Sequence, residues 1–334
     1  MVAVRQAEIA QLLAGADDPG LFSAAEALTR ENFAGKVYLR GVVEFSNHCR
    51  NNCRYCGLRA ANQNVHRYRL GVPDILACAA LARELSIGTI VVQSGDDFSY
   101  TADDIAQVIV GAKADSNVAV TLSLGDRTEA ELAHWRSCGA DRYLLKIETF
   151  DEALYAHCRP GLTVADRLTR LAALRRAGYE VGSGVITDLP GMTPDILAAD
   201  LLKLADLDLD MIAVGPFVPH PDTPFGRERP GSILTAFRAM AILRLLAPLA
   251  NIPSTSALNA LRDGAREQGL TVGANVVMPS LTPETVSPDY AIYPGKNAFR
   301  AGARERVEAA REAVRRVGLT PSTAVGGSKR RHHG

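Results

Sequence analysis

This 334-residue sequence has few of the features that assign a protein to a class at first reading. Lysine plus arginine and aspartate plus glutamate number 37 each, so no net field favours nucleic acid or an anionic membrane as a partner. No apolar run approaches the roughly 20 residues that span a bilayer, and the N-terminus lacks the basic and apolar regions of an export signal. These absences predict a soluble, cytoplasmic protein that binds neither nucleic acid nor membrane.

Cysteine is also scarce, and six residues in a chain of this length argue against a disulfide framework. Three of the six nevertheless fall close together, at Cys49, Cys53 and Cys56, directly after the apolar run 37–45. Three thiolates on one short loop can hold three irons of a 4Fe-4S cluster and leave the fourth iron open to a small molecule. That arrangement is used to cleave S-adenosylmethionine reductively and release a 5′-deoxyadenosyl radical.

Structural zinc is the main alternative for this CxxxCxxC spacing, because His48 or His66 could supply a fourth ligand. A zinc site usually has paired ligand spacing, however, and the chain has no second CxxC. We therefore interpret the three cysteines as cluster ligands.

Apolar runs of strand length alternate with helical patterns along the chain. Strands are expected at 37–46, 89–94, 118–124, 142–148, 181–187, 211–217, 252–258 and 271–278. Helices are expected near 4–15, 22–33, 73–86, 102–114, 128–137, 163–177, 193–206, 232–248, 259–268 and 299–317. This alternation predicts an α/β fold, a (β/α)8 barrel of the TIM type with N-terminal helices and a C-terminal helix. No linker divides the chain, so residues 1–325 are expected to form one domain and 326–334 a disordered tail.

Polar residues recur on one face of several predicted strands. In the run 142–148 the outward set is apolar (Tyr143, Leu145, Ile147), and the inward set contains Arg142, Lys146 and Glu148. Two other strands repeat the pattern, with Thr121 and Ser123 in one, and Arg40 and Glu44 in the other. Buried charges are costly unless they pair or meet a ligand, so a structural ion-pair ladder is the alternative. Repetition on three strands favours a polar ligand cavity inside the barrel.

Stretches from about Gly41 to Gly295 carry a more specific signal. They are 44–47 with the cysteine loop as far as Arg59, then 67–70, 93–95, 123–128, 141–149, 215–224, 273–279 and 293–295. Together they resemble the radical S-adenosylmethionine superfamily and, within it, the HydE family of FeFe-hydrogenase maturases. The cysteine motif alone identifies only the superfamily, whereas the later stretches indicate the family.

The resemblance implies a role for each matching residue. Cys49, Cys53 and Cys56 hold one 4Fe-4S cluster. The residues expected around S-adenosylmethionine are Tyr55, Gly95, Asp96, Ser123, Glu148, Arg167 and Met211. Those expected to line the substrate cavity and take part in catalysis are Gln93, Thr121, Arg142, Lys146, Thr255, Ser256, Met278 and Tyr290.

The substrate that the resemblance implies is an organometallic iron species carrying cysteine, carbon monoxide and cyanide. It is processed toward the diiron subcluster of the hydrogenase, with other maturation proteins as partners. Anionic cyanide and carboxylate groups suit a cavity that holds Arg142 and Lys146. Lys146 stands where the resemblance leads us to expect arginine, and Asp96 where it leads us to expect glutamate, so the cavity departs from the family pattern at these positions.

Two other functions are compatible with the cysteine motif. One is a radical mutase resembling methylornithine synthase, which shares the barrel and the cluster; the stretch 215–224 favours the HydE type instead. The other is a non-catalytic iron-sulfur or metal-binding protein. Polar residues along several strands argue against it, since a barrel without a ligand has no need of them.

Overall fold

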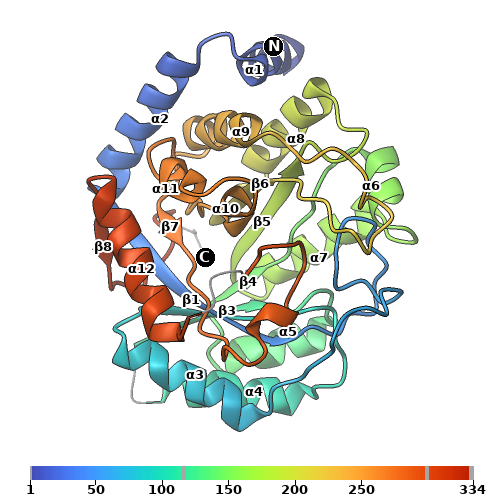
Figure 1. The fold of residues 1–334 in the computed structure, drawn as a ribbon, viewed down its shortest axis with the longest axis vertical. Helices are drawn as coiled ribbons and strands as arrows, with labels where there is room; N and C mark the ends of the chain where they lie inside the picture. The colour runs from blue at the N-terminus through green and yellow to red at the C-terminus, as the bar shows by residue number, and fades with distance from the viewer. Residues whose placement is uncertain (1, 115–116, 298–300, 331–334) are drawn as a thin grey trace.

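The computed structural model describes residues 2–114, 117–297 and 301–330. A parallel sheet curls around the centre of the molecule and helices surround it (Figure 1). The strands are β1 (Lys36–Ser46), β2 (Thr89–Ser94), β3 (Ala119–Ser123), β4 (Arg142–Leu144), β5 (Glu180–Thr187), β6 (Met211–Pro216), β7 (Val276–Val277) and β8 (Thr320–Ser322). Their order is β6-β5-β4-β3-β2-β1-β7, with β8 paired to β1. The predicted α/β class with parallel strands is confirmed.

Twelve α-helices lie in the part of the chain that the structure describes. They are α1 (Val2–Ala14), α2 (Asp18–Phe33), α3 (Val72–Glu84), α4 (Ala102–Lys113), α5 (Glu129–Ser137), α6 (Glu152–Cys158), α7 (Val164–Arg176), α8 (Pro194–Asp206), α9 (Ile233–Leu246), α10 (Ser256–Leu261), α11 (Ala265–Gly269) and α12 (Ala303–Arg316). The N-terminal helices lie on the outside of this layer, where α1 packs on α8 and α9, and α2 packs on α9. No helix of the described residues has the length and apolar character needed to cross a membrane.

The strand expected at 252–258 is not formed. The chain makes only two isolated bridges there, Asn251 to Met211 and Pro253 to Val276. Pro253 has no N–H to donate to a ladder, and α10 begins at Ser256 directly afterwards. The two bridges nevertheless join β6 to β7, so they connect the two ends of the strand order.

Other elements differ locally from expectation. The strand expected at 271–278 is reduced to β7, because a turn precedes it in which Gly273 has a φ of +124°. The helix expected at 259–268 is divided into α10 and α11 at Gly264, whose φ is +77°. Helix α6 was not predicted. Thr163 caps the start of α7, since its hydroxyl accepts a hydrogen bond from the amide of Asp166.

The alternation predicted along the strands places apolar residues under the helices. Val43, Val92, Leu122 and Tyr143 belong to one buried core between sheet and helices. The opposite faces point into the ring, where a cavity of about 30 Å³ is lined by Arg40, Val91, Thr121, Leu144, Met211, Ala213, Asn251, Pro253, Val276 and Met278. The interior is therefore polar in part, as expected, but side chains fill most of it.

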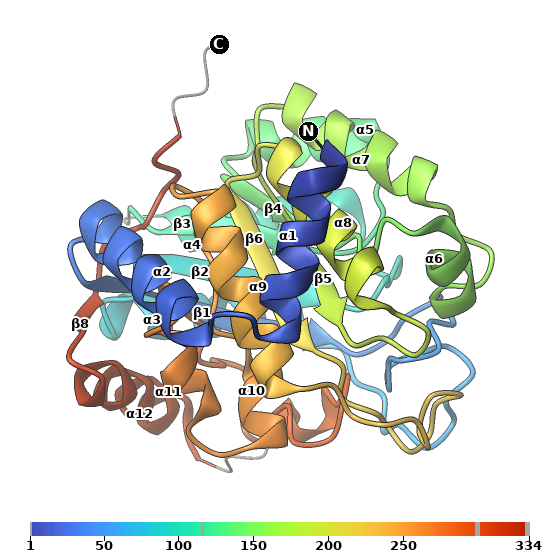
Figure 2. The ribbon, with the colours of Figure 1, turned by 90° about the horizontal axis from the view of Figure 1, so that it is seen from above.

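The end of the described chain also differs from expectation. Residues 326–330, expected to be disordered, continue from β8 along the ring, and Gly326 is buried. We call residues 323–330 the C-terminal strap. In Figure 2 the strap leaves the barrel on the side opposite the loop that follows β1. Residues 331–334 of the expected tail lie outside the described residues.

Candidate functional site

The three clustered cysteines lie on the loop that follows β1, at the carboxyl end of the sheet. Three distant segments hold this loop through backbone hydrogen bonds. The amide of Arg50 donates to Asp96 O at 3.1 Å, that of Arg54 to Cys158 O at 2.8 Å, and that of Gly57 to Ile292 O at 2.9 Å. The loop is therefore fixed to the ends of β2 and α6 and to the chain near residue 292.

Two glycines allow these segments to approach the cysteine loop. A Cβ atom at Gly95 would lie 2.1 Å from the carbonyl oxygen of His48 and 2.8 Å from the Cβ of Cys49. A Cβ atom at Gly57 would lie 2.2 Å from the carbonyl oxygen of Ala291. Backbone atoms cannot yield to such contacts, so both positions require glycine. Gly95, expected beside the cofactor, is thus in contact with the cysteine loop.

All three thiols are free and partly exposed. Burial raises the pKa of Cys49 and of Cys56, and the neighbouring Cys53 raises both further. The thiols at these two positions are accordingly protonated at neutral pH until a metal displaces their protons.

The donor set fits a 4Fe-4S cluster. Among the described residues, no three histidine, cysteine, aspartate or glutamate side chains are grouped to bind one metal ion. A cluster has a different requirement, because each thiolate binds a different iron. Three thiols spread over residues 49–56, on a loop anchored at three points, meet that requirement.

Asp96 lies directly behind the cysteine loop, as expected for a residue beside the cofactor. Its Oδ2 accepts hydrogen bonds from Arg50 Nε at 3.0 Å and from Asn51 Nδ2 at 2.8 Å. Its Oδ1 is buried and has no hydrogen-bond partner among the residues that the structure describes. A buried acceptor without a partner costs free energy unless a ligand supplies a donor, so Asp96 can receive one.

Glu148 and Lys146 follow β4 at the same end of the barrel. Lys146 Nζ lies 2.8 Å from Glu148 Oε2, and the two side chains are 29% and 12% exposed. Glu148 has a φ of +71°, which is strained for a residue with a Cβ atom. Its backbone is held there by β5, because its amide donates to Gly184 O at 2.9 Å. The strain is typical of a functional position.

Further residues expected around the cofactor and substrate lie near the same carboxyl end of the barrel. Gln93 and Ser123 are paired neighbours at the ends of β2 and β3. Arg167, in α7, is buried and forms an ion pair with Asp126 at 3.0 Å. Tyr55, on the cysteine loop, packs against a group of buried apolar side chains, which are Leu154, Cys158, Leu189, Phe217 and Phe225. These contacts place Gln93, Ser123 and Tyr55 at the carboxyl end of the sheet.

The segment from 255 to 297 supplies the remaining predicted residues. Tyr290 is buried in a group with Leu58 and Tyr68, and Cys49 and Cys56 pack against this group. Ser256 Oγ lies 2.7 Å from the hydroxyl of Tyr293. The hydroxyls of Thr255 and Thr121 are buried, and neither has a hydrogen-bond partner in the described part of the chain. Thr121 and Met278 line the central cavity itself.

Two predicted site residues lie elsewhere. Arg142 and Met211 begin β4 and β6, so they are at the amino end of the sheet, away from the cysteine loop. Arg142 Nε lies 2.6 Å from Glu180 Oε2, and Nη1 donates to Thr89 Oγ1 at 2.9 Å. Met211 Sδ accepts from Arg40 Nη1 at 2.8 Å. The structure therefore does not bring these two residues to the rim where the other predicted residues gather.

Sequence reasoning missed an ion pair beside the cysteine loop. Glu44, at the end of β1, is fully buried and lies 2.9 Å from Lys296 Nζ. Ser280 Oγ donates to the same carboxylate at 2.6 Å, and Thr282 bonds it as well. The matched stretch 293–295 ends just before Lys296, which was the available signal. The ion pair ties the segment 280–297 across the carboxyl end of the barrel.

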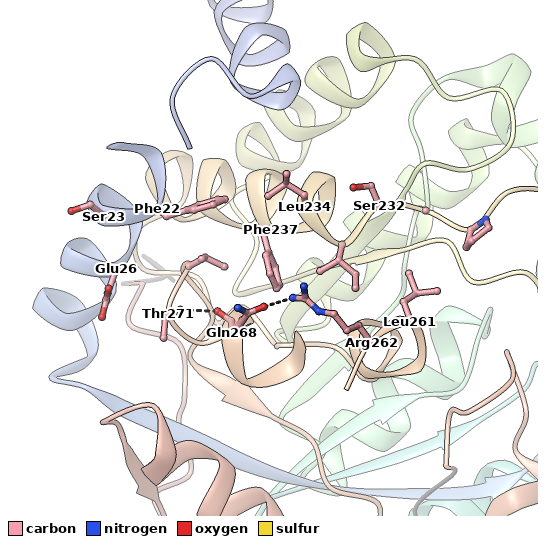
Figure 3. Close-up of a pocket in the computed structure, with 14 residues that line it drawn as sticks. Phe22, Ser23, Glu26, Ser232, Leu234, Phe237, Leu261, Arg262, Gln268 and Thr271 are labelled. Carbon is pink, nitrogen blue, oxygen red and sulfur yellow. Dashed lines mark hydrogen bonds between the residues drawn. The ribbon is translucent and has the colours of Figure 1, made fainter. Parts of the chain in front are cut away.

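A pocket much larger than the central cavity lies outside the barrel. It measures about 900 Å³ and is formed between α2, α9 and the α10–α11 region (Figure 3). Its lining is Phe22, Ser23, Glu26, Pro230, Gly231, Ser232, Ile233, Leu234, Phe237, Leu261, Arg262, Gln268, Thr271 and Val272. None of the predicted site residues lines it, so its size does not make it the candidate site.

Comparison with known proteins identifies relatives of the sequence. The model of the Radical SAM superfamily matches residues 43–204. The chain is 40% identical over 310 residues to the FeFe hydrogenase maturase subunit HydE of Thermotoga maritima, which covers 93% of this chain and 89% of that protein. It is 28% identical over 259 residues to the 3-methylornithine synthase of Methanosarcina acetivorans, covering 77% and 73% of the two chains.

Solved structures share the fold. The crystal structure of methylornithine synthase has a TM-score of 0.83 at 24% identity and covers 95% of this chain and 94% of its own. The structure of the hydrogenase maturase HydG has a TM-score of 0.78 at 19% identity, covering 94% and 72%. At these identities the similarity shows the architecture alone.

Proposed function

Since the chain belongs to the HydE family of radical SAM enzymes, which bind a 4Fe-4S cluster and S-adenosylmethionine, we propose that it processes an organometallic iron species during assembly of the hydrogenase diiron subcluster. The species carries cysteine, carbon monoxide and cyanide. The observation that supports this proposal most is the loop of Cys49, Cys53 and Cys56, fixed at the open end of a partly polar barrel.

Different residues of this chain would bind the cluster and S-adenosylmethionine. Cys49, Cys53 and Cys56 would ligate the cluster. When bound, the cluster and S-adenosylmethionine supply the radical that begins the reaction. The Oδ1 of Asp96 would accept a hydrogen bond from the amino group of S-adenosylmethionine, and Gly95 allows the cysteine loop to lie close beside it.

The charged residues at the rim would orient both molecules. Glu148, held in a strained conformation, presents its carboxylate to the ribose hydroxyls. Lys146 is the cation nearest to that carboxylate, and it would attract an anionic cyanide or carboxylate group of the substrate. A lysine ammonium is a point charge, so it tolerates several orientations of the anion where arginine would impose one.

The segment 280–297 would exclude water from the reacting atoms. Its attachment through Lys296 to Glu44 and through Ile292 to Gly57 covers the cysteine loop from the side of α12. Exclusion of water keeps a radical from side reactions. Other hydrogenase maturation proteins would deliver the substrate and accept the product.

Anaerobic reconstitution tests the proposal in two steps. A protein with a full 4Fe-4S complement and a strong reductant should convert S-adenosylmethionine into 5′-deoxyadenosine and methionine. Addition of an iron complex bearing cysteine, carbon monoxide and cyanide, together with the other maturation proteins, should then activate a hydrogenase that lacks its diiron subcluster. Cleavage without activation would contradict the substrate, and a loaded cluster without cleavage would contradict the activity.

A further inference from the structure

The C-terminal strap crosses the amino end of the barrel. Four side chains from different parts of the ring donate hydrogen bonds to two of its carbonyl oxygens. Thr89 Oγ1 donates to Val325 O at 2.7 Å and Arg142 Nη2 donates to it at 3.4 Å. Arg40 Nη2 and Asn251 Nδ2 donate to Gly326 O at 3.1 and 3.2 Å. The donors belong to β1, β2, β4 and the bridge beside β6, so the strap spans the opening.

The strap lies directly against the wall of the central cavity. Arg40 and Asn251, which both bond Gly326, line that cavity. Thr121, Met211 and Met278 line it as well. Removal of the strap would therefore expose Arg40 and Asn251, and with them one side of the cavity, at the end opposite the cluster ligands.

The contacts of the strap are of a kind that water can replace. Its residues 324–328 are alanine, valine, two glycines and serine, so they bury little apolar surface. The hydrogen bonds that join it to the sheet use its carbonyls and the side chains of the sheet. Near the end, Lys329 bonds the carbonyl of Asn32 and Arg330 pairs with Asp208. Segments held by few apolar contacts open at low free energy.

We propose that the strap is a displaceable floor, and that the amino end of the barrel is a second passage into the interior, through which an anionic small-molecule product leaves. The part concerning the product rests on the proposed function. Displacement frees Arg40 Nη2 and Arg142 Nη2, whereas Arg142 keeps its bonds to Glu180 and Thr89. Guanidinium groups bind carboxylate and other anions with paired hydrogen bonds. A product that leaves here passes out without displacing the cofactor at the other end.

Adjacent glycines offer a matched pair of variants. Gly326 has a φ of +60°, and a Cβ atom there would lie 2.5 Å from the ring of Tyr38. A Cβ atom at Gly327 would lie 3.3 Å from Glu180 Oε1, the end of a flexible side chain. Gly326→Ala should therefore lift the strap, whereas Gly327→Ala should leave it in place. The substitutions are chemically identical and one residue apart.

Oxidation of methionine by hydrogen peroxide in the full-length apoprotein, followed by mass spectrometry, reports access to the interior. Met211 lines the cavity above the strap, and Met240, buried in α9, serves as the reference. Gly326→Ala should speed oxidation of Met211 about tenfold and speed tryptic cleavage after Lys329, with Met240 unchanged. Gly327→Ala should change none of these rates. The readout needs neither cluster nor substrate, so it does not depend on the proposed function.

Three results would overturn the proposal. The first is faster cleavage after Lys329 in Gly326→Ala with no change at Met211, because the strap would then not be the barrier. The second is equal acceleration at Met211 and Met240, which reports general unfolding. The third uses a chain shortened after Thr323, in which the floor is absent: unchanged oxidation of Met211 in that variant would exclude a passage whatever Gly326→Ala does.

Discussion

Each end of the barrel holds an ion pair with glutamate, and the two pairs differ in how exposed the cation is. At the amino end, Arg142 pairs with Glu180 at 2.6 Å, and the arginine side chain is 1% exposed. At the carboxyl end, Lys146 pairs with Glu148 at 2.8 Å, and the lysine side chain is 29% exposed. Arg142 also bonds Thr89 and the strap, so its donors are committed within the chain. Lys146 remains partly open at the rim that holds the cysteines.

The difference separates structural charge from charge available to a ligand. Buried groups whose hydrogen bonds are made within the chain stabilise one arrangement. The carboxyl end instead combines a buried acceptor without a partner on Asp96, a strained Glu148 and three partly exposed thiols. Groups of that kind gain free energy from a bound molecule. Substitutions made at each end separately test this difference between the two ends.

The largest effect is expected at the cysteine loop. Cys53→Ala should abolish both the cluster and the formation of 5′-deoxyadenosine, because two thiolates do not hold the cluster with one open iron. Iron and sulfide analysis, the visible spectrum and product chromatography measure the loss. Cys138→Ala, at the end of α5, is the control and should retain full activity. An active Cys53→Ala protein would refute the ligand assignment.

At the amino end, Arg142→Met should lower the free energy of unfolding by about 3 kcal/mol, because it leaves Glu180, Thr89 and a strap carbonyl without their donor. Denaturant unfolding of the apoprotein measures this change. The affinity of the reconstituted protein for S-adenosylmethionine should be unaltered. A weaker affinity with unchanged stability would show that Arg142 belongs to the active site and would contradict its structural role at the amino end.

At the carboxyl end the expected pattern is reversed. Lys146→Met should change the free energy of unfolding by less than about 1 kcal/mol, since the pair is partly exposed. It should weaken binding of S-adenosylmethionine about tenfold, or ~1.4 kcal/mol, because Glu148 loses the cation that orients it. Lys146→Arg, which keeps the charge, is the control. Calorimetric titration gives the affinities, and equal affinity in Lys146→Met would remove Lys146 from the site.

The smallest effect is a pH dependence beside the cysteine loop. Burial alone would raise the pKa of Asp97, but hydrogen bonds from Arg69 and Ser46 outweigh it and lower the pKa to about 2. In the unfolded chain the pKa is about 3.9. Asp97 thus stabilises the fold above pH 4, and this stability is lost as the pH falls toward 2. Asp97→Asn should flatten the acid unfolding curve over that interval, whereas an identical curve would contradict the shift.

The sequence predicts most of the elements that position the site. Strands β1 to β3, β5 and β6 lie within a residue or two of expectation, because their alternating apolar residues pack under helices. The pattern failed at 252–258, where an apolar run contains Pro253 and forms only bridges. Propensity read along the chain does not reveal that the hydrogen bonds needed for a strand are missing.

Alternation also predicts the inward face without predicting the height of a residue along the barrel. Arg142 and Lys146 share that face, yet the first residue of β4 lies at one end and the fifth residue of the run 142–148 lies at the other. The strap was missed for a different reason. Its burial depends on carbonyl oxygens that meet distant arginines, and carbonyls leave no pattern in a sequence.

Hydrogen exchange of the reconstituted protein with and without S-adenosylmethionine tests the division between the two ends most directly. We predict slower exchange in peptides covering 47–57, 93–97 and 146–149, where the cysteine loop, Asp96 and Glu148 lie. Peptides covering the start of β4 and β6 and the strap should exchange at the same rate in both states. Protection at Arg142, Met211 and the strap, with none around the cysteines, would contradict the assignment of the reactive end.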